Sequence, residues 1–445
     1  MCFIAGTKDR QTLDYMFNIM KHRAPDGDGF VEYPDYLIGM GRLAIIDLVS
    51  PGLCPYREGE FTLAFNGEIY NYIELRKELE ELGHQFSTTS DTEVLFKCFK
   101  QWGIRDGIRK FNGMFAFAIS DGKQIFLARD IAGEKPLYYR EDPFEFASEA
   151  KALKWDCKEF PPQFYGIYDI ETKKLEIKRY WTLTLHSINM ETAEAELEVL
   201  LEDAIKIRTR SDVPYGLYYS GGVDSSLIKT FHHFEHLFTY EDGDFKREFL
   251  KVFPKILWHL DYPVSSFSPF GLWKLAEQAK KAGVKVVISG EGADELFGGY
   301  VRYLPHAFAY QAWQVFPSYK DMFQLPVSAN RVGWDEFNGN LRELLRMGDR
   351  MTSAFGIENR CPFLDKRIIE FAFSLPPLMK IDGFTLKKIL RKILYKRDPN
   401  YKDIEKTGLF CSVNKWLDSE DGFGKNDYMK YQEEIYEDIK LKCSL

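Results

Sequence analysis

The sequence predicts two successive folds, an α+β region over residues 1–185 and an α/β region with a parallel sheet over residues 186–445. In the first region, the apolar runs 113–119 and 125–128 are separated by a short polar segment, as neighbouring strands are. In the second region, strand-like and helical runs alternate, which is typical of a parallel sheet. Two polar, glycine-rich loops follow strands there, and parallel sheets bind ligands at the carboxyl ends of their strands.

The composition is that of an ordinary globular chain. Its 445 residues suffice for two or three domains, 45% of them are hydrophobic, and the formal net charge is −8. This charge argues against a nucleic-acid partner or a polybasic membrane surface. No run reaches the roughly 18 apolar residues of a membrane-spanning helix, and no signal peptide is evident. The 7 cysteines form no CxxC pair, which argues against structural zinc and favours a reducing compartment, the cytoplasm.

Cys2 is the first candidate catalytic residue. Because its side chain is small, aminopeptidase removal of Met1 is permitted, and removal would leave an α-amine beside the thiol. An α-amine has a pKa of about 7.7–8.0 and can act as the general base for that thiol near neutrality. On position alone, a small buried residue of a first strand is the commoner interpretation.

The polar residues that follow favour the catalytic interpretation. The strand-like run 61–65 ends in Asn66, Gly67 and Glu68. The Asn66 amide and the Gly67 N–H could form an oxyanion hole. Glu68 beside them could bind a substrate ammonium.

Two helices are expected next in this region. One spans 72–82 and has an apolar face of Ile73, Leu75, Leu79 and Leu82. The other begins at Ser90-Asp91, where Asp91 is either part of a helix N-cap arrangement or a second ligand for the ammonium.

Ser220–Ser226 is the expected anion site of the second region. It lies between a short apolar run and a helical run. Gly221 and Gly222 allow a sharp turn, whose N–H groups and following helix N-terminus attract phosphate, and Ser220 and Ser225 add hydroxyl donors. Two glycines alone are equally consistent with a tight turn without a ligand, and no Walker motif is present, because no Gly-Lys-Ser/Thr follows.

The second polar loop, 289–300, follows the strand-like run 284–288. Since the carboxyl ends of parallel strands meet at one edge of a sheet, Asp224 and Asp294 are expected near each other, as a two-carboxylate site for Mg²⁺ on ATP. A helix N-cap with acids in its first turn would explain Asp294, but it does not explain four glycines in 289–300.

Together these residues resemble the glutamine-dependent asparagine synthetase family, in motifs that run from Cys2 to about Trp416. The resemblance implies an N-terminal-nucleophile glutaminase domain over 1–185, with stacked antiparallel sheets between helices. It implies a PP-loop ATP pyrophosphatase domain with a parallel sheet over 186–445. The implied substrates are glutamine, ATP and aspartate or another carboxylate, with Mg²⁺ as the metal. A homodimer remains open as the assembly.

The resemblance also assigns roles. In the glutaminase domain, these are Cys2 as nucleophile, Asn66 and Gly67 for the oxyanion, Arg42 for the glutamine α-carboxylate, and Glu68 and Asp91 for its α-ammonium. ATP is assigned to Ser220, Gly221, Gly222, Asp224, Ser225, Ser289 and Gly290, and Mg²⁺ to Asp224 and Asp294. The remaining roles are Lys387 (or its neighbour Lys388) for the pyrophosphate leaving group, Glu291 near the acceptor or ammonia, Arg360 and Asp365 around the acceptor, and Arg23 and Met114 along the ammonia path.

The sequence departs from the family pattern at several positions. Phe3 and Ala24 stand where the family has glycine, and Gly41 where it has histidine. Phe3 could crowd the glutamine pocket. The segment between Tyr240 and Leu272 is too short for the family's helix, strand and further helix, so one βα unit is expected to be reduced or lost, beside the acceptor pocket.

Other functions therefore stay open. The chain could amidate another carboxylate, close an amide ring, or be a pseudoenzyme that binds nucleotide or glutamine. The joint presence of the candidate residues argues against a pseudoenzyme, because a decaying site should have lost at least one of them.

Overall fold

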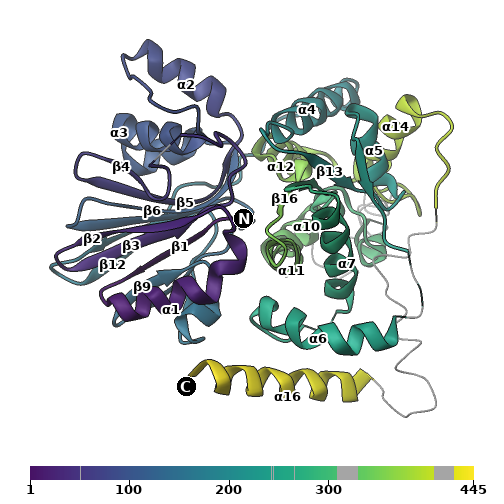
Figure 1. Cartoon of the computed structure of the whole chain (residues 1–445). Helices are drawn as coiled ribbons and strands as arrows, with labels where there is room; N and C mark the ends of the chain where they lie inside the picture. The colour runs from purple at the N-terminus through teal and green to yellow at the C-terminus, as the bar shows by residue number, and fades with distance from the viewer. Residues whose placement is uncertain are drawn as a thin grey trace, which may run out of the picture.

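The computed structural model describes residues 1–445 except 51, 242, 244, 265, 308–328, 405–424 and 445. Two parts lie side by side in Figure 1, an N-terminal part with two large sheets and a C-terminal part in which helices surround a smaller sheet. The run 405–410, where the basic pattern of the family is altered, lies outside the described residues.

Two six-stranded antiparallel sheets form the N-terminal part, in the orders β10-β8-β9-β1-β3-β2 and β12-β11-β7-β6-β5-β4. The strands of the first sheet are β1 (Phe3–Thr7), β2 (Asp28–Tyr33), β3 (Tyr36–Gly41), β8 (Tyr138–Glu141), β9 (Phe144–Ala147) and β10 (Lys158–Glu159). The strands of the second sheet are β4 (Tyr56–Glu58), β5 (Phe61–Ile69), β6 (Gly113–Ser120), β7 (Gln124–Arg129), β11 (Phe164–Asp169) and β12 (Lys174–Arg179).

The two sheets pack face to face between helices, as the predicted fold class requires. Small and branched side chains fill the space between them, among them Ile4, Ile38, Ala64, Ala116 and Leu127. Helix α1 (Arg10–Met20) packs on β1 and β3, while α2 (Tyr72–Glu81) and α3 (Asp91–Lys110) lie on the side of β5, as Figure 1 shows.

One strand differs from its prediction. The strand was predicted over 61–65 with Asn66, Gly67 and Glu68 at its end, whereas β5 includes these three residues and continues to Ile69. It continues because β6 pairs with it throughout, with Asn66 opposite Ala116, Gly67 opposite Phe115 and Glu68 opposite Met114. The candidate oxyanion residues therefore lie within a strand, where the sheet holds their backbone fixed.

A four-stranded parallel sheet forms the centre of the C-terminal part, in the order β14-β13-β15-β16. Its strands are β13 (Tyr215–Tyr218), β14 (His236–Phe238), β15 (Val286–Ile288) and β16 (Glu358–Arg360). The described α-helices here are α4 (Ala193–Arg208), α5 (Val223–Phe231), α6 (Lys246–Leu260), α7 (Ser268–Lys281), α8 (Ala293–Phe297), α10 (Ala329–Asn338), α11 (Asn340–Ser353), α12 (Lys366–Ser374), α13 (Pro377–Lys380), α14 (Lys388–Arg397) and α16 (Lys425–Ser444). Short 3₁₀ helices are η1 (Lys21–Arg23), η2 (Ala150–Leu153), η3 (Val301–Tyr303) and η5 (Pro362–Leu364).

Helices cover both faces of this sheet. Leu217 of β13 packs into the core shared by α4 and α5, whereas the next residue, Tyr218, packs with Leu275 and Ala279 of α7. This alternation is expected of a strand that is buried on both faces. The expected boundary at 185/186 falls in the connection between β12 and α4.

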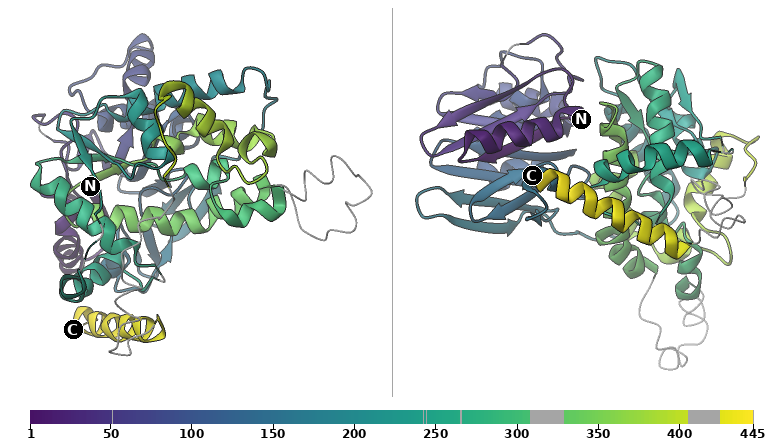
Figure 2. Two further views of the ribbon diagram at one scale, coloured as in Figure 1. Left: turned by 90° about the vertical axis from the view of Figure 1, so that its right-hand side faces the viewer. Right: turned by 60° about the horizontal axis from the view of Figure 1, so that its bottom comes forward.

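The shortened segment forms helices α6 and α7, and the described residues between β14 and β15 include no strand. Strand β14, predicted at 238–240, begins two residues earlier and is the edge of the sheet. Helix α16 packs on α6 and extends towards the N-terminal part in Figure 2, where the rings of Tyr436 and Trp155 are 5.9 Å apart. None of the described helices combines the length and apolarity needed to cross a membrane.

Candidate active sites

Cys2 lies directly before β1, half-buried and close to Leu43. The Leu43 backbone N–H points to the Cys2 Sγ over 3.4 Å. Burial raises the pKa of the Cys2 thiol, and burial lowers the pKa of the Met1 α-amine to about 5. Once Met1 is removed, an α-amine at Cys2 would be similarly buried, and burial favours its neutral, proton-accepting form.

Asn66 and Gly67 have the properties of an oxyanion hole. Asn66 is fully buried, and neither its Nδ2 nor its Oδ1 has a hydrogen-bond partner among the described residues. Such an unpaired group costs about 1–3 kcal/mol, so it is expected where a ligand supplies the partner. Gly67 has φ +152°, and a Cβ there would lie 2.1 Å from the Met114 carbonyl oxygen, so glycine is required for this close approach.

Glu68 and Asp91 are two buried acids in the same place. Glu68 Oε1 lies 3.1 Å from Nη2 of Arg360 on β16, while its Oε2 has no hydrogen-bond partner among the described residues. Burial, together with the charge of Asp91, raises the pKa of Glu68. Asp91 accepts the Ile69 N–H over 2.9 Å, and burial raises its pKa to about 6. A bound ammonium would stabilise the ionised form of each carboxyl, so the pair suits a substrate ammonium.

Arg42 directly follows β3. Its Nη2 donates to the carbonyl oxygens of Ile46 and Asp47 over 3.1 and 2.6 Å. Neutral carbonyls orient the guanidinium without cancelling its charge, which fits a residue that binds a substrate carboxylate.

Phe3 does not crowd this site, because its ring lies on the opposite face of β1 from Cys2. Phe3 is directly opposite Gly41 in the sheet, and a Cβ on Gly41 would lie 2.1 Å from the Phe3 ring. The ring contacts Phe17 of α1 at 5.0 Å between centroids. The two departures from the family pattern are therefore complementary, since the large side chain at position 3 fills the space that a side chain at position 41 would need.

In the C-terminal part, the predicted turn between β13 and α5 spans residues 219–222, and Ser225 and Ser226 lie in the first turn of α5. Gly221 has φ +74°, and Ser220 Oγ lies 3.2 Å from Ser225 Oγ. The loop after β15 lies against it, because a Cβ on Gly290 would be 2.8 Å from the Asp224 Cβ. Ser289 Oγ is directed at the Cys361 Sγ, 3.5 Å away. Both predicted loops thus meet at the carboxyl ends of β13 and β15.

Lys387 joins the two loops. Its Nζ lies 2.5 Å from Asp224 Oδ2 and 2.8 Å from Asp294 Oδ1. Burial works against its charge, but the two carboxylates outweigh burial and raise the pKa of Lys387. Gly299 makes this cluster possible, since a Cβ there would lie 1.8 Å from Asp294 Oδ1. Lys388 instead binds Asp382 over 2.6 Å, so the geometry favours Lys387 for the predicted role.

The same cluster bears on the expected metal. Among the described residues, no group of three or more His, Cys, Asp or Glu side chains could hold a metal ion. Mg²⁺ is commonly held by one or two carboxylates together with substrate phosphates. Asp224 and Asp294 fit that arrangement, because both approach one point that a cation, Lys387, already occupies.

Glu291 lies in the turn between β15 and α8 and is half-buried. Asn359 Nδ2 donates to its Oε2 over 2.9 Å, and the Cys361 thiol lies 3.5 Å from the same oxygen. Burial raises the pKa of Glu291 to about 7, although these hydrogen bonds oppose the shift. Such a carboxyl can exchange a proton near neutrality, which suits the role predicted near acceptor and ammonia.

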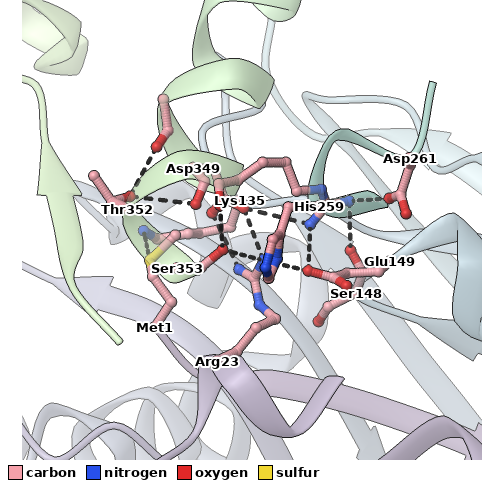
Figure 3. Close-up of polar contacts among 12 residues, drawn as sticks. Met1, Arg23, Lys135, Ser148, Glu149, His259, Asp261, Asp349, Thr352 and Ser353 are labelled. Atoms are coloured by element: carbon pink, nitrogen blue, oxygen red, sulfur yellow. Dashed lines mark hydrogen bonds and ion pairs between the residues drawn. The ribbon is translucent and has the colours of Figure 1, made fainter. Parts of the chain in front are cut away.

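Arg23, predicted along the ammonia path, lies in a buried ionic cluster between the two parts of the chain (Figure 3). It donates two hydrogen bonds to Asp349 of α11, over 2.9 and 3.1 Å, and one to Glu149 over 3.0 Å. Its Nε also donates to the Cys2 carbonyl oxygen over 3.0 Å. Arg23 therefore connects the backbone of the candidate nucleophile to the C-terminal part.

The other predicted residues of the interface are also buried. Met114 packs with Tyr70 and Ile207 in a small apolar cluster. Asp365 accepts from Arg208 and Asn112 over 3.0 and 2.8 Å, so it ties both parts together.

Comparison with known proteins agrees with this arrangement. The pattern of the glutamine amidotransferase domain matches residues 1–177, and that of asparagine synthase matches 196–236 and 235–418. A candidate glutamine-hydrolysing asparagine synthetase 2 of Methanocaldococcus jannaschii is 33% identical over 383 positions, which cover 66% of this chain and 73% of that protein. The chain belongs to the asparagine synthase family.

Two further members show how the chain differs within this family. Glutamine-hydrolysing asparagine synthetases 1 and 3 of Bacillus subtilis are 29% and 28% identical, and each alignment covers 94% of this chain. They cover 86% and 89% of the two relatives. The alignments extend over 549 and 550 positions, more than the 445 residues of the chain, so they contain gaps, as a shortened member requires.

Sequence reasoning missed the residues that reach these sites from a distance. Asn359, which donates to Glu291, lies beside Arg360 in the stretch expected near the acceptor, but it was assigned no role. Asp349 and Glu149 meet Arg23 only through the tertiary fold. One signal was available for Asp349: it is a charged residue on the buried face of α11. Charged residues are rarely buried without a partner, so this position indicated an ion pair.

Proposed function

We propose that this protein is a glutamine-hydrolysing asparagine synthetase, with ATP as the activating substrate. The observation that carries the proposal is the presence of two complete sets of groups in one chain. An unpaired Asn66 amide lies in the half that holds Cys2, and Lys387 lies between Asp224 and Asp294 in the other half. Family membership supports the same function.

In the glutaminase reaction, Cys2 attacks the side-chain amide of glutamine and its thiol proton passes to the Cys2 α-amine. The Asn66 Nδ2 and the Gly67 N–H stabilise the negative charge that develops on the amide oxygen. Arg42 holds the α-carboxylate, and Glu68 and Asp91 hold the α-ammonium. Ammonia leaves, and water then cleaves the thioester to glutamate.

In the synthetase reaction, a carboxylate oxygen of the acceptor attacks the α-phosphorus of ATP, and the bond to pyrophosphate breaks. Lys387 offsets the charge of the departing pyrophosphate, which the Ser220 loop binds through its hydroxyl and N–H groups. Asp224 and Asp294 would hold Mg²⁺, which neutralises phosphate charge when bound. Ammonia then attacks the acyl carbon and AMP leaves, with Glu291 placed to accept the proton that the nitrogen loses.

Aspartate is the acceptor we propose. Another carboxylate, including one that closes an amide ring, remains the second candidate, because the acceptor pocket lies beside the shortened segment between β14 and β15. We also propose a cytoplasmic location, since the described cysteines Cys2, Cys54, Cys98, Cys157 and Cys361 are all free thiols.

Pyrophosphate release tests the proposal. The protein is incubated with ATP, Mg²⁺, ammonium and a panel of carboxylates that includes aspartate, and pyrophosphate and the amide product are measured. If aspartate is the one carboxylate of the panel that causes pyrophosphate release, the protein is an asparagine synthetase. If another carboxylate causes the release, that carboxylate is the acceptor. If no carboxylate causes pyrophosphate release, the protein is a pseudoenzyme.

A further inference from the structure

A small cavity lies between the two parts of the chain, outside both proposed sites. Ile108, Phe111 and Ala132 line it from the N-terminal part, Tyr180 and Trp181 from the connecting segment, and Leu364 from the C-terminal part. It has room for about one water-sized molecule. Ammonia and the ammonium ion are of this size, whereas glutamine, ATP and amino-acid acceptors are far too large.

Glu134 lines this cavity and is 7% exposed. Within the part of the chain that the structure describes, its carboxylate has no hydrogen-bond or ion-pair partner. The neighbouring Asp130 differs, because its two oxygens accept the N–H groups of Phe115, Gly133, Glu134 and Lys135. Asp130 therefore shapes the loop, whereas the carboxylate of Glu134 is left for a ligand in the cavity.

Glu134 also lies within electrostatic reach of the synthetase site. Burial raises the pKa of Glu134 to about 8, Asp130 and Glu291 add to the shift, and Arg208 and Lys135 oppose it. Glu134 in turn helps to raise the pKa of the Cys361 thiol, which contacts Glu291. The geometry agrees, because Leu364, which lines the cavity, also lies against the turn that carries Glu291: a Cβ on Gly292 would be 2.4 Å from the Leu364 Cδ2.

We propose that the cavity is an ammonium site and that Glu134 is the proton acceptor through which ammonium from solvent can supply nitrogen to the synthetase reaction. One N–H bond of the ammonium ion breaks and its proton passes to a carboxylate oxygen of Glu134. Neutral ammonia moves on towards Glu291, and Glu134 returns the proton to water through the cavity. This inference rests on the proposed function, and it adds a nitrogen route that does not involve Cys2.

The outer rim of the cavity sets the rate of entry. Exposed Arg109 and half-buried Lys366 line it, and the Lys366 Nζ donates to the Arg109 carbonyl oxygen over 3.2 Å. Two cations at the rim repel an incoming ammonium ion, and salt screens this repulsion. The Lys366→Gln substitution is therefore expected to raise kcat/KM for ammonium by roughly twofold, in the opposite direction to a change at Glu134.

The test compares the two nitrogen sources in the full-length protein. Amide formation is measured with glutamine and, separately, with ammonium chloride, for the wild type, Glu134→Gln and the surface control Glu141→Gln. Loss of a general base lowers a rate by roughly 10²-fold. Glu134→Gln should therefore lose about that factor in kcat/KM for ammonium and change the glutamine-dependent rate by less than about twofold. Glu141→Gln should change neither.

The pH profile separates proton acceptance from packing. The wild-type kcat/KM for total ammonium should rise with an inflection near pH 8, where Glu134 ionises. In Glu134→Gln, kcat/KM for total ammonium should lack that inflection and should change with pH only as the fraction of free ammonia in solution changes. Ala132→Leu, which fills the cavity, should lower ammonium use and keep the inflection.

Several results would overturn the inference. Equal losses with both nitrogen sources would make Glu134 a structural residue, and unchanged ammonium use in Glu134→Gln and Ala132→Leu would remove the cavity from the route. Either result leaves the proposed function intact, provided that the wild type forms the amide from glutamine. A wild type that forms no amide from either source contradicts the proposed function itself, and the inference with it.

Discussion

Asn66 and Lys387 are both buried polar residues, yet they stand in opposite situations. The Asn66 amide has no hydrogen-bond partner among the described residues, whereas Lys387 is enclosed by the carboxylates of Asp224 and Asp294. In the proposed glutaminase site, this unpaired amide is the group that we propose stabilises the charge that develops during the reaction. In the proposed synthetase site, the cation is instead held in an internal ion cluster, which ATP would have to rearrange in order to bind there.

The largest expected effect is at Lys387. Lys387→Met leaves two carboxylates facing each other and removes a cation from the pyrophosphate, so pyrophosphate release should fall by about 10³–10⁵-fold. Glutamine hydrolysis should be retained. Lys388→Met is the matched control, because Lys388 is bound to Asp382 outside the cluster. A similar loss in Lys388→Met would mean that the two lysines have been assigned the wrong way round.

The second-largest effect is expected at the interface between the two sites. Asp349→Asn removes the carboxylate that accepts two hydrogen bonds from Arg23, and breaking a buried ion pair costs about 3–5 kcal/mol. Chemical denaturation should report that loss in the free energy of unfolding. The exposed pair Arg10–Asp14 provides the control, since Asp14→Asn should cost less than about 1 kcal/mol. Equal effects would show that the buried cluster does not hold the two parts together.

A substitution at Asn66 should lower the rate of glutamine hydrolysis without lowering the stability of the fold. Asn66→Ala removes an oxyanion donor and should lower kcat for glutamine hydrolysis by about 10²–10³-fold. Its thermal stability should hold or rise, because the lost amide had no partner to lose. Asn71→Ala should lower the thermal stability and leave kcat for glutamine hydrolysis nearly unchanged, since the Asn71 side chain hydrogen-bonds to the backbone of Lys110 and Asn112. A strongly destabilised Asn66→Ala would contradict the view that this amide is reserved for a ligand.

The smallest effect is a pH dependence at Asp91. Its pKa is raised to about 6, so the carboxylate is present above that pH and is lost as the pH falls through it. The kcat/KM for glutamine should therefore decrease about tenfold per pH unit below 6, because the α-ammonium loses a partner. In Asp91→Asn the value should be low throughout and lack this inflection. An unchanged inflection would assign it to another group.

Local signals in the sequence predicted much of the fold. The apolar period over 72–82 gave α2 at Tyr72–Glu81, and Ser90 caps α3 by accepting the Thr92 N–H over 3.1 Å. The two loops at the ends of β13 and β15 were also predictable, since glycine and polar residues after a strand mark such turns.

Interactions between distant segments could not be predicted in this way. The extension of β5 to Ile69 depends on its pairing with β6, and the place of the Phe3 ring depends on the missing side chain of Gly41. Arg23 has an ordinary local sequence, but its partner Asp349 lies more than 300 residues along the chain. Such pairs are set by the packing of the whole fold, which a local pattern does not contain.

The transfer of nitrogen tests the central claim most directly. The protein is incubated with amide-labelled glutamine, aspartate, ATP and Mg²⁺ in excess unlabelled ammonium, and the product is examined by mass spectrometry. We expect labelled asparagine, with AMP and pyrophosphate, and loss of the label in Cys2→Ala. Asparagine that carries only unlabelled nitrogen in the wild type, or the absence of asparagine, would contradict the account.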